Sequence, residues 1–182
     1  PKIEDLRTIG VMISGKKVSV NETDDLENNN GEMFSFLAVP VVSQPKPGSN
    51  EVNKAFDECW IGSNGYIKTD GSRQRRAIAY QGNVVDENGD TKTEIFVADI
   101  PEDILETAAS EDLRGTETHR PKVPERITQR RITFTKHGVS STPRHWLRSD
   151  PEGTKIAFLA KDSNDIVQLH LVSPNNVSDA PR

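Results

Sequence analysis

The chain has 182 residues, of which 33% are hydrophobic and 28% are charged, and its formal net charge is −5 at neutral pH. Its mean hydropathy of −0.65 is typical of a modest core that carries long polar loops. The acidic balance argues against general nucleic-acid binding, and no apolar run approaches the roughly 18–20 residues of a membrane span. The single cysteine, Cys59, excludes an internal disulfide and a cysteine-based zinc site.

The first third of the chain has the weakest pattern. Residues 11–14 and 17–20 could form a hairpin around Gly15 and Lys16, and residues 33–42 form the most apolar run, interrupted by a proline. Residues 56–61 predict another short strand. We therefore assign residues 1–59 to a poorly defined β region.

A clearer unit covers residues 60–101. A polar turn at residues 86–90 separates two short β-type runs, 78–80 and 94–98. After it, residues 101–109 predict a short helix with acidic residues in its first turn, followed by a charged, proline-rich loop. We interpret residues 102–126 as an insertion consisting of this helix and loop.

A second unit covers residues 127–182, and residues 129–134 are expected to be the strand that opens it. In the turn at residues 149–153, Asp150 can bond the backbone ahead, Pro151 presets φ and Gly153 permits a positive φ. Strands are predicted at residues 155–159 and 166–172, joined by a polar loop. Alternation in the second strand places His170 on its polar face, where we expect it to be exposed.

The two units are related by an internal repeat. Residues 66–72 align with 146–152, residues 78–80 with 156–158, and residues 94–98 with 168–172, with an offset of 78 residues from Ile78 to Ile156. In each aligned pair of segments, residues of the same chemical class occur in the same order. The residues assigned to the structural repeat are Tyr66, Asp70, Trp146, Asp150 and Gly153.

Short strands with Gly, Pro and Asp turns, repeated as units, favour a β-propeller over a sandwich. The run WLRSDPEGTKIAF at residues 146–158, followed by a polar turn and a strand that leads to Ser-Pro-Asn, resembles the blade motif of TolB-like six-bladed propellers. It is also similar to blades of prolyl oligopeptidase-type propellers and of oligogalacturonate lyase. Residues 130–133 resemble the Arg-x-Leu-Thr element that opens such blades. Residues 75–101 and 129–175 together look like a bacterial TolB-like family of unknown function.

The resemblance implies an all-β chain that is a partial β-propeller with long polar loops and one short helix. A ring needs at least about four blades, more than this chain holds, so the chain is expected to be a fragment. The remaining blades are expected on an absent chain segment or on a second subunit, because an open arc exposes blade faces and strand edges. The resemblance alone favours a periplasmic location over a cytoplasmic one.

Four residues before the second hairpin are candidate ligand-binding residues. Arg144 and Arg148 offer forked donors to an anion or a sugar acid. His137 and His145 offer a base. The structural alternative is a turn in which Asp150 bonds the backbone while Trp146 packs between blades, and we prefer it for these two residues. No metal-ligand spacing or serine-nucleophile motif is present, so no metal, cofactor or catalytic residue is predicted. The candidates are His137, Arg144, His145 and Arg148.

Three functions remain open. The leading hypothesis is a non-catalytic propeller that binds a protein or a small molecule, with neither nucleic acid nor membrane as partner. The second is a propeller enzyme, a lyase or hydrolase, that acts on an acidic saccharide through a His/Arg site at the channel. The third is the propeller domain of a larger peptidase. Fold analogy cannot separate the first two.

Overall fold

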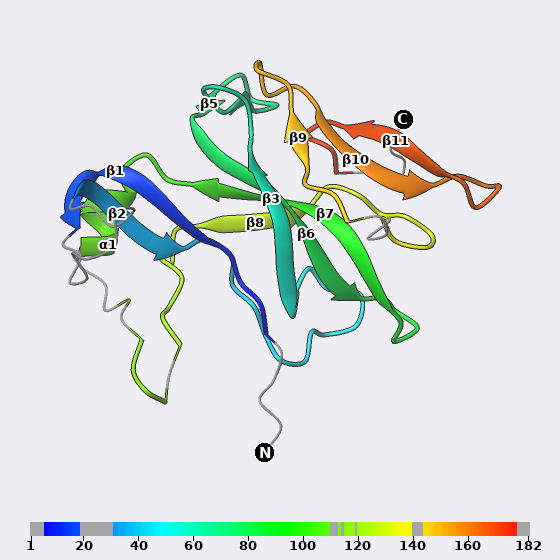
Figure 1. The fold of residues 1–182 in the computed structure, drawn as a ribbon, viewed down its shortest axis with the longest axis horizontal. Coiled ribbons are helices and arrows are strands. Elements are labelled where there is room, and N and C mark those ends of the chain that lie inside the picture. The colour runs from blue at the N-terminus through cyan, green and yellow to red at the C-terminus, as the bar shows by residue number, and fades with distance from the viewer. Residues whose placement is uncertain are drawn as a thin grey trace, which may run out of the picture.

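The structure is a computed structural model that describes residues 6–18, 31–109, 113, 115–118, 120–139 and 144–177. This part of the chain is all-β, with several antiparallel sheets and one short helix (Figure 1). In chain order the elements are β1 (Gly10–Val18), β2 (Gly31–Leu37), β3 (Lys54–Trp60), β4 (Tyr66–Ile67), β5 (Arg73–Gln74), β6 (Arg76–Val85), β7 (Thr91–Ile100), α1 (Ile104–Ala109), β8 (Thr128–Arg131), β9 (Arg148–Ser149), β10 (Ile156–Lys161) and β11 (Val167–Val172).

A four-stranded antiparallel sheet in the order β3-β6-β7-β8 lies in the middle of the molecule. Strands β6 and β7 pair without interruption from Arg76 opposite Ile100 to Val85 opposite Thr91. Residues on both faces of β6 are buried, as expected for a strand that is covered on two sides. The predicted strands at residues 78–80 and 94–98 are confirmed as parts of this hairpin, and the predicted helix is α1.

The last strand of this sheet corrects two boundaries of the sequence analysis. Strand β8 pairs with β7, with Arg131 opposite Phe96, so it closes the first sheet and does not open the second unit. Strand β3 also belongs to this sheet, so the boundary expected between residues 59 and 60 falls inside a strand. The pattern of a short strand contains no information about its partner, because pairing is decided by distant residues.

The second sheet has the order β11-β10-β9 and is also antiparallel. The turn before β10 forms as predicted: Gly153 N–H donates to the carbonyl of Asp150 at 3.1 Å, and the Asp150 carboxylate accepts the Lys155 N–H at 2.8 Å. Gly153 has φ of +70°, which a glycine adopts without a steric penalty. This confirms the expected backbone role of Asp150.

The strand register confirms the central part of the internal repeat. Ile78 lies opposite Ala98 in the first sheet, and Ile156 lies opposite Val172 in the second. The predicted matches of residues 78–80 with 156–158 and of 94–98 with 168–172 therefore hold in three dimensions.

Two further features recur in both hairpins. A stacked cross-strand ring pair occupies the same position in each, Tyr80 with Phe96 at 5.4 Å between ring centroids and Phe158 with His170 at 5.7 Å. In each turn the first aspartate, Asp86 or Asp162, accepts hydrogen bonds from the backbone N–H groups two and four residues ahead. The two hairpins are thus built by the same local chemistry.

The segment that leads into the central strand of each unit, residues 66–72 in the first and 146–152 in the second, does not follow the expected alignment. In the second sheet Ser149 pairs with Ile156, whereas in the first sheet the residue opposite Ile78 is Trp60 of β3. Tyr66 lies instead in a separate two-stranded sheet, β4-β5. That small hairpin is an extra loop between β3 and β6, and its Asp70 accepts a backbone hydrogen bond from Ser72 at 2.8 Å. The similar aspartate turns of the two lead-ins explain the shifted alignment.

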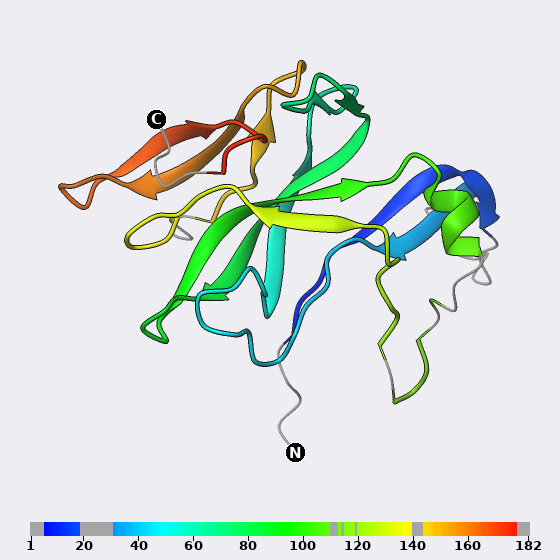
Figure 2. The ribbon, with the colours of Figure 1, turned by 180° about the vertical axis from the view of Figure 1, so that it is seen from behind.

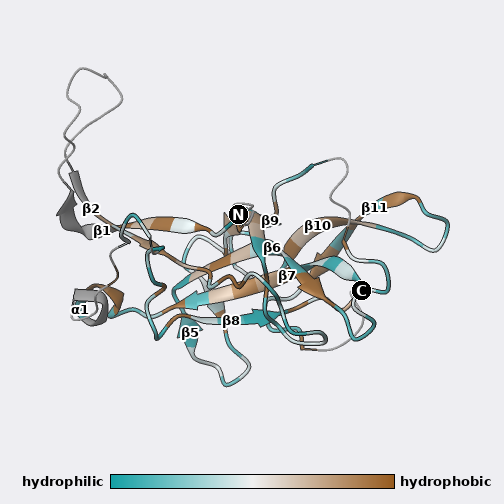
Figure 3. Ribbon diagram, turned by 90° about the horizontal axis from the view of Figure 1, so that it is seen from below, coloured by the Kyte–Doolittle hydropathy of each residue, from teal (hydrophilic) through white to brown (hydrophobic). Residues whose placement is uncertain are grey.

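The first sheet is covered on both faces, as the front and back views show (Figures 1 and 2). One face packs against the β1-β2 hairpin and α1, and the other packs against the sheet formed by β9, β10 and β11. Figure 3 shows hydrophobic residues along the central strands and hydrophilic residues in many of the turns and loops. The core therefore consists of two apolar layers that share the β6-β7 hairpin.

Strand β11 corrects the expectation for His170. His170 is half-buried and stacks on Phe158, because its face of the hairpin packs against the first sheet. The exposed face carries Leu169, which is 69% exposed, and Leu171, which is 41% exposed. The repeat aligns these two leucines with Ile95 and Val97, which are fully buried between the two sheets.

The N-terminal hairpin also differs from the prediction. Strand β1 continues through Gly15 and Lys16, with a register shift between Ser14 and Lys17, and pairs with β2 from Gly10 opposite Leu37 onwards. The expected hairpin around Gly15 and Lys16 is therefore wrong, because a bulge takes up the irregularity within one strand. No helix in the described part of the chain is long and apolar enough to cross a membrane.

Candidate functional site

The first strands of the two sheets, β3 and β9, lie side by side. Leu147 N–H donates to the carbonyl of Asp57 at 3.2 Å, and Gly62 N–H donates to the Ser149 hydroxyl at 3.0 Å. The two units therefore meet at their first strands. We call the surface at this junction the first-strand edge; its side chains are Asp57, Arg144, Trp146 and Arg148.

Glycines make close contact between the units possible at this junction. A Cβ atom on Gly153 would lie 2.1 Å from the carbonyl oxygen of Gly65, and one on Gly62 would lie 2.4 Å from the same atom. All three glycines have positive φ. Backbone therefore packs against backbone here, which leaves no room for a side chain.

A buried carboxylate fixes an arginine on the first-strand edge. Asp57 is 4% exposed, has φ of +53° and lies where the register of β3 shifts between Phe56 and Cys59. Its Oδ1 atom accepts hydrogen bonds from Nε of Arg144 at 2.9 Å and from Nη2 at 2.7 Å. These hydrogen bonds raise the pKa of Arg144. Bulges and residues with positive φ both occur often beside functional sites.

A tryptophan lies beside this arginine on the first-strand edge. The guanidinium of Arg144 lies 4.9 Å from the ring centre of Trp146, and Trp146 is 51% exposed. This differs from the expectation that Trp146 packs between units. Trp60 of β3 is 47% exposed, but it lies opposite Ile78, in the layer that packs against the β1-β2 hairpin. A fixed guanidinium beside the exposed indole ring of Trp146 can bind an anion that also presents an apolar surface, through the donors that Asp57 does not use.

The predicted histidines do not join this site. The Nε2 atom of His145 accepts the Leu159 N–H at 3.1 Å, and its carbonyl accepts a hydrogen bond from Gln81 at 3.0 Å. His145 therefore links the two sheets, and the ring nitrogen that would act as a base is already an acceptor. His137 lines a separate pocket of about 630 Å³ beside the β10-β11 turn, together with His170.

Arg148 also has a local role, since its Nη1 atom donates to the carbonyl of the preceding Leu147 at 2.9 Å. Of the four predicted ligand-binding residues, Arg144 and Arg148 thus lie on the first-strand edge. His137 and His145 lie against other parts of the structure. In the part of the chain that the structure describes, no group of three or more His, Cys, Asp or Glu residues is arranged to hold a metal ion.

Two other chemically distinctive side chains are structural. Burial raises the pKa of the Cys59 thiol to about 11, so the nucleophilic thiolate is scarce at neutral pH. Tyr66 is buried, and its hydroxyl donates to Asp99 at 2.9 Å and accepts from Arg130 at 2.6 Å. Arg130 also donates to the carbonyl of Pro174 at 2.7 Å, which ties the segment after β11 to the first sheet.

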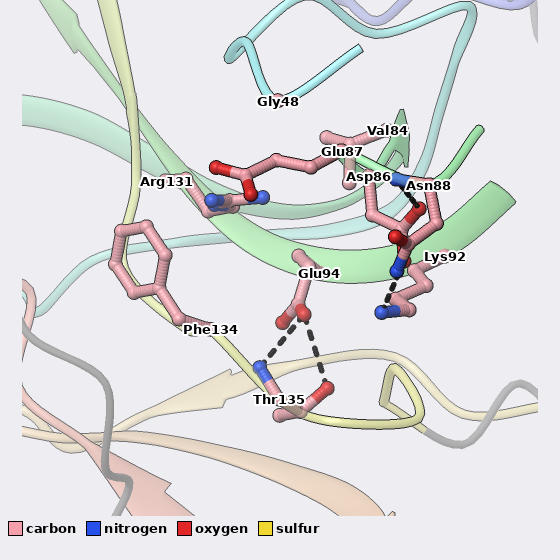
Figure 4. A pocket seen from close by; sticks show the side chains of 10 residues that line it. All are labelled: Gly48, Val84, Asp86, Glu87, Asn88, Lys92, Glu94, Arg131, Phe134 and Thr135. Carbon is pink, nitrogen blue, oxygen red and sulfur yellow. Dashed lines mark hydrogen bonds and ion pairs between the residues drawn. The ribbon is translucent and has the colours of Figure 1, made fainter. Parts of the chain in front are cut away.

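A pocket that the sequence analysis missed lies between the β6-β7 turn and the segment after β8 (Figure 4). Its volume is about 290 Å³, and we call it the hairpin pocket. Three carboxylates and two cations contribute to its lining. Its lining residues are Gly48, Val84, Asp86, Glu87, Asn88, Lys92, Glu94, Arg131, Phe134 and Thr135.

Glu94 is a buried carboxylate in the wall of this pocket, 2% exposed. Its Oε1 atom accepts the Thr135 N–H at 2.8 Å and the Thr135 hydroxyl at 3.0 Å, and its Oε2 atom accepts the Thr133 hydroxyl. Burial raises the pKa of Glu94, against the opposing effect of these hydrogen bonds. The sequence signal was present: Glu94 begins the apolar run of β7, where an unpaired charge is costly.

Arg131 also lines the hairpin pocket. Its guanidinium lies 4.2 Å from the ring centre of Phe134. Its Nε atom is buried and has no hydrogen-bond partner among the described residues. Lys92, the other cation of the hairpin pocket, is ion-paired with Asp86.

The sequence is 38% identical over 176 residues to the uncharacterized protein YidR of Escherichia coli (strain K12), and the alignment covers 93% of this chain and 39% of that protein. The chain thus spans about two fifths of the length of this relative. No family model matches the chain, and no solved structure matches it.

Proposed function

We propose that the two sheets are neighbouring blades of a TolB-like β-propeller whose ring is completed by residues outside this chain. Three features support this proposal: the recurrence of ring pair and turn in both hairpins, the meeting of the sheets at their first strands, and the greater length of the relative. In a propeller the first strands of the blades surround the central channel. The first-strand edge is then part of the channel wall.

The function we propose is that of a non-catalytic binding scaffold. The observation that carries it is the Arg144 guanidinium, which Asp57 holds over the exposed Trp146 ring at the first-strand edge. Preorganised arginine and exposed indole groups are suited to binding because little side-chain freedom is lost on contact. The ligand class that fits is an anion with a flat apolar surface, carried by a small molecule or by a protein.

The enzyme and peptidase alternatives receive less support from these residues. A lyase or hydrolase needs a base beside the bound anion, but His145 uses Nε2 as an acceptor for a backbone N–H and His137 lines a different pocket. Cys59 is no substitute because burial raises its pKa to about 11. A peptidase would require a hydrolase domain in addition to these residues.

The test uses the protein at its full natural length and two probes, trigalacturonate and its fully methyl-esterified form. The account predicts that calorimetry detects binding of the acid but not of the ester, that Arg144→Ala removes it, and that no cleavage product appears. Equal binding of acid and ester would contradict an anion-binding channel wall, and no binding of either would exclude an acidic saccharide as the ligand. Release of saccharide fragments with unsaturated or new reducing ends would show that the protein is an enzyme and not a non-catalytic scaffold.

A further inference from the structure

The charged groups of the hairpin pocket differ in how far their contacts satisfy them. Within it, Asp86 and Lys92 are ion-paired, and Glu94 accepts hydrogen bonds from Thr133 and Thr135. Arg131 makes a different contact, with the ring of Phe134, and its buried Nε has no partner among the described residues. A buried donor without a partner is uncommon in native proteins and calls for an explanation.

Hydrogen bonds from side chains to the backbone fix two segments that form the pocket. On one side the Asp86 carboxylate holds the β6-β7 turn through the backbone N–H groups of Asn88 and Asp90. On the other side Glu94 holds the backbone of Thr135. Figure 4 shows both of these anchors, with Arg131 and Phe134 on the same side of the pocket. Such a cavity, largely formed before a ligand enters, is the usual form of a small-molecule site.

The charges of the lining indicate the class of ligand. Asp86, Glu87 and Glu94 supply three carboxylates, and Lys92 and Arg131 supply two cations. A ligand that carries only negative charge would face an excess of carboxylates. A zwitterion can place its carboxylate on the forked donors of Arg131 and its ammonium group toward the carboxylates, while Val84 and Phe134 offer apolar surface to its side chain.

We propose that the hairpin pocket binds a small zwitterion of the α-amino-acid type, with Arg131 receiving the carboxylate and Glu87 receiving the ammonium group. The volume of about 290 Å³ accommodates a molecule of this size. The site is separate from the first-strand edge, and the proposal does not depend on the proposed ring or scaffold function.

The experiment titrates the protein at its full natural length with three probes of nearly equal shape: L-leucine, isocaproate, which lacks the ammonium group, and isoamylamine, which lacks the carboxylate. Calorimetry or ligand-observed NMR measures the dissociation constants. We expect leucine to bind about tenfold to a hundredfold more tightly than either analogue, because each lost charge removes a charge-assisted hydrogen bond.

Two substitutions assign the binding to this pocket. Arg131→Lys keeps the charge but removes the forked donor, and it should weaken leucine binding about tenfold or more. Glu87→Gln changes an exposed side chain, so folding is unaffected; it should weaken leucine binding but leave isocaproate binding unchanged. Any of three results would overturn the proposal. Leucine could bind no more tightly than isocaproate, both substitutions could leave leucine binding intact, or leucine binding could be undetectable at millimolar concentration.

Discussion

Asp57 and Arg144 are 87 residues apart in sequence, yet the buried carboxylate of Asp57 holds both Nε and Nη2 of Arg144 through a single oxygen atom. The side chain of Asp57 is 3% exposed and that of Arg144 is 56% exposed. The pair therefore joins the interior of the first sheet to the surface of the segment that precedes the second. It connects the two repeated units and positions the group that we propose to bind ligands.

Substitution of Arg144 by alanine should lower thermal stability, because it leaves the Asp57 carboxylate buried without its cationic partner. We expect the unfolding midpoint to fall by about 3–8 °C. Arg148→Ala is the matched control, since Arg148 donates to the carbonyl of its neighbour Leu147 and should change the midpoint little. The combination Asp57→Asn with Arg144→Ala should recover part of the loss. Scanning calorimetry measures all of these, and equal effects of the two arginine substitutions would contradict the account.

Gly153→Ala should be among the most destabilising alanine substitutions in the chain. The new Cβ would lie 2.1 Å from the Gly65 carbonyl oxygen, so the two units must separate locally, at a cost of about 2–4 kcal/mol. Gly71→Ala is the control, because Gly71 also has a positive φ but nothing lies within 4 Å of its Cβ position. That change should cost only about 1 kcal/mol of backbone strain. Urea unfolding would distinguish them, and similar losses would mean that the units do not pack as described.

The stability difference between Glu94→Gln and the native protein should depend on pH. Burial raises the pKa of Glu94 in the folded state above its ordinary value of 4.5. The folded protein then binds more protons than the unfolded chain between these two pKa values, so native stability falls as pH rises through that window. Glutamine does not titrate, and the variant should therefore gain stability relative to the native protein as pH rises above about 4.5. Unfolding free energies from pH 4 to 7 measure this, and a constant or falling difference is the contrary result.

Local chemistry explains what could be predicted from the sequence. The turn at Asp150 and Gly153 uses residues that bond their own neighbours, and the alternation of β10 and β11 specifies a hairpin within a few residues. Neither the strand that pairs with β8 nor the burial of the β11 face that carries His170 could be predicted. Both depend on which sheet covers which face. The extra β4-β5 hairpin misled the alignment, since its Asp70 turn imitates the one at Asp150.

In the candidate sites, too, local features could be predicted from the sequence and contacts between distant segments could not. Arg144 and Arg148 were identified by residue type, but the carboxylate that fixes Arg144 lies 87 residues away at a bulge with no sequence signature. Glu94 gave a signal, a charge at the start of an apolar run, but its threonine partners come from the segment after β8. Non-local contacts between short segments of this kind are visible only in three dimensions.

If the two sheets are blades of a larger ring, the exposed face of the β10-β11 hairpin is covered in the complete protein. Leu169 occupies the repeat position of Ile95, which is fully buried between the two sheets. A third blade would bury Leu169 in the same way, although it is 69% exposed here.

The measurement is the rate of maleimide labelling of Leu169→Cys and Val177→Cys in the protein at its full natural length, read at each site by peptide mass spectrometry. Val177 is 78% exposed and serves as the reference, and Cys59 should react slowly because burial raises its pKa to about 11. The account predicts that position 169 is labelled at least about tenfold more slowly than position 177, since a covered site reacts only on local opening. Equal labelling rates at the two positions would contradict a ring of blades.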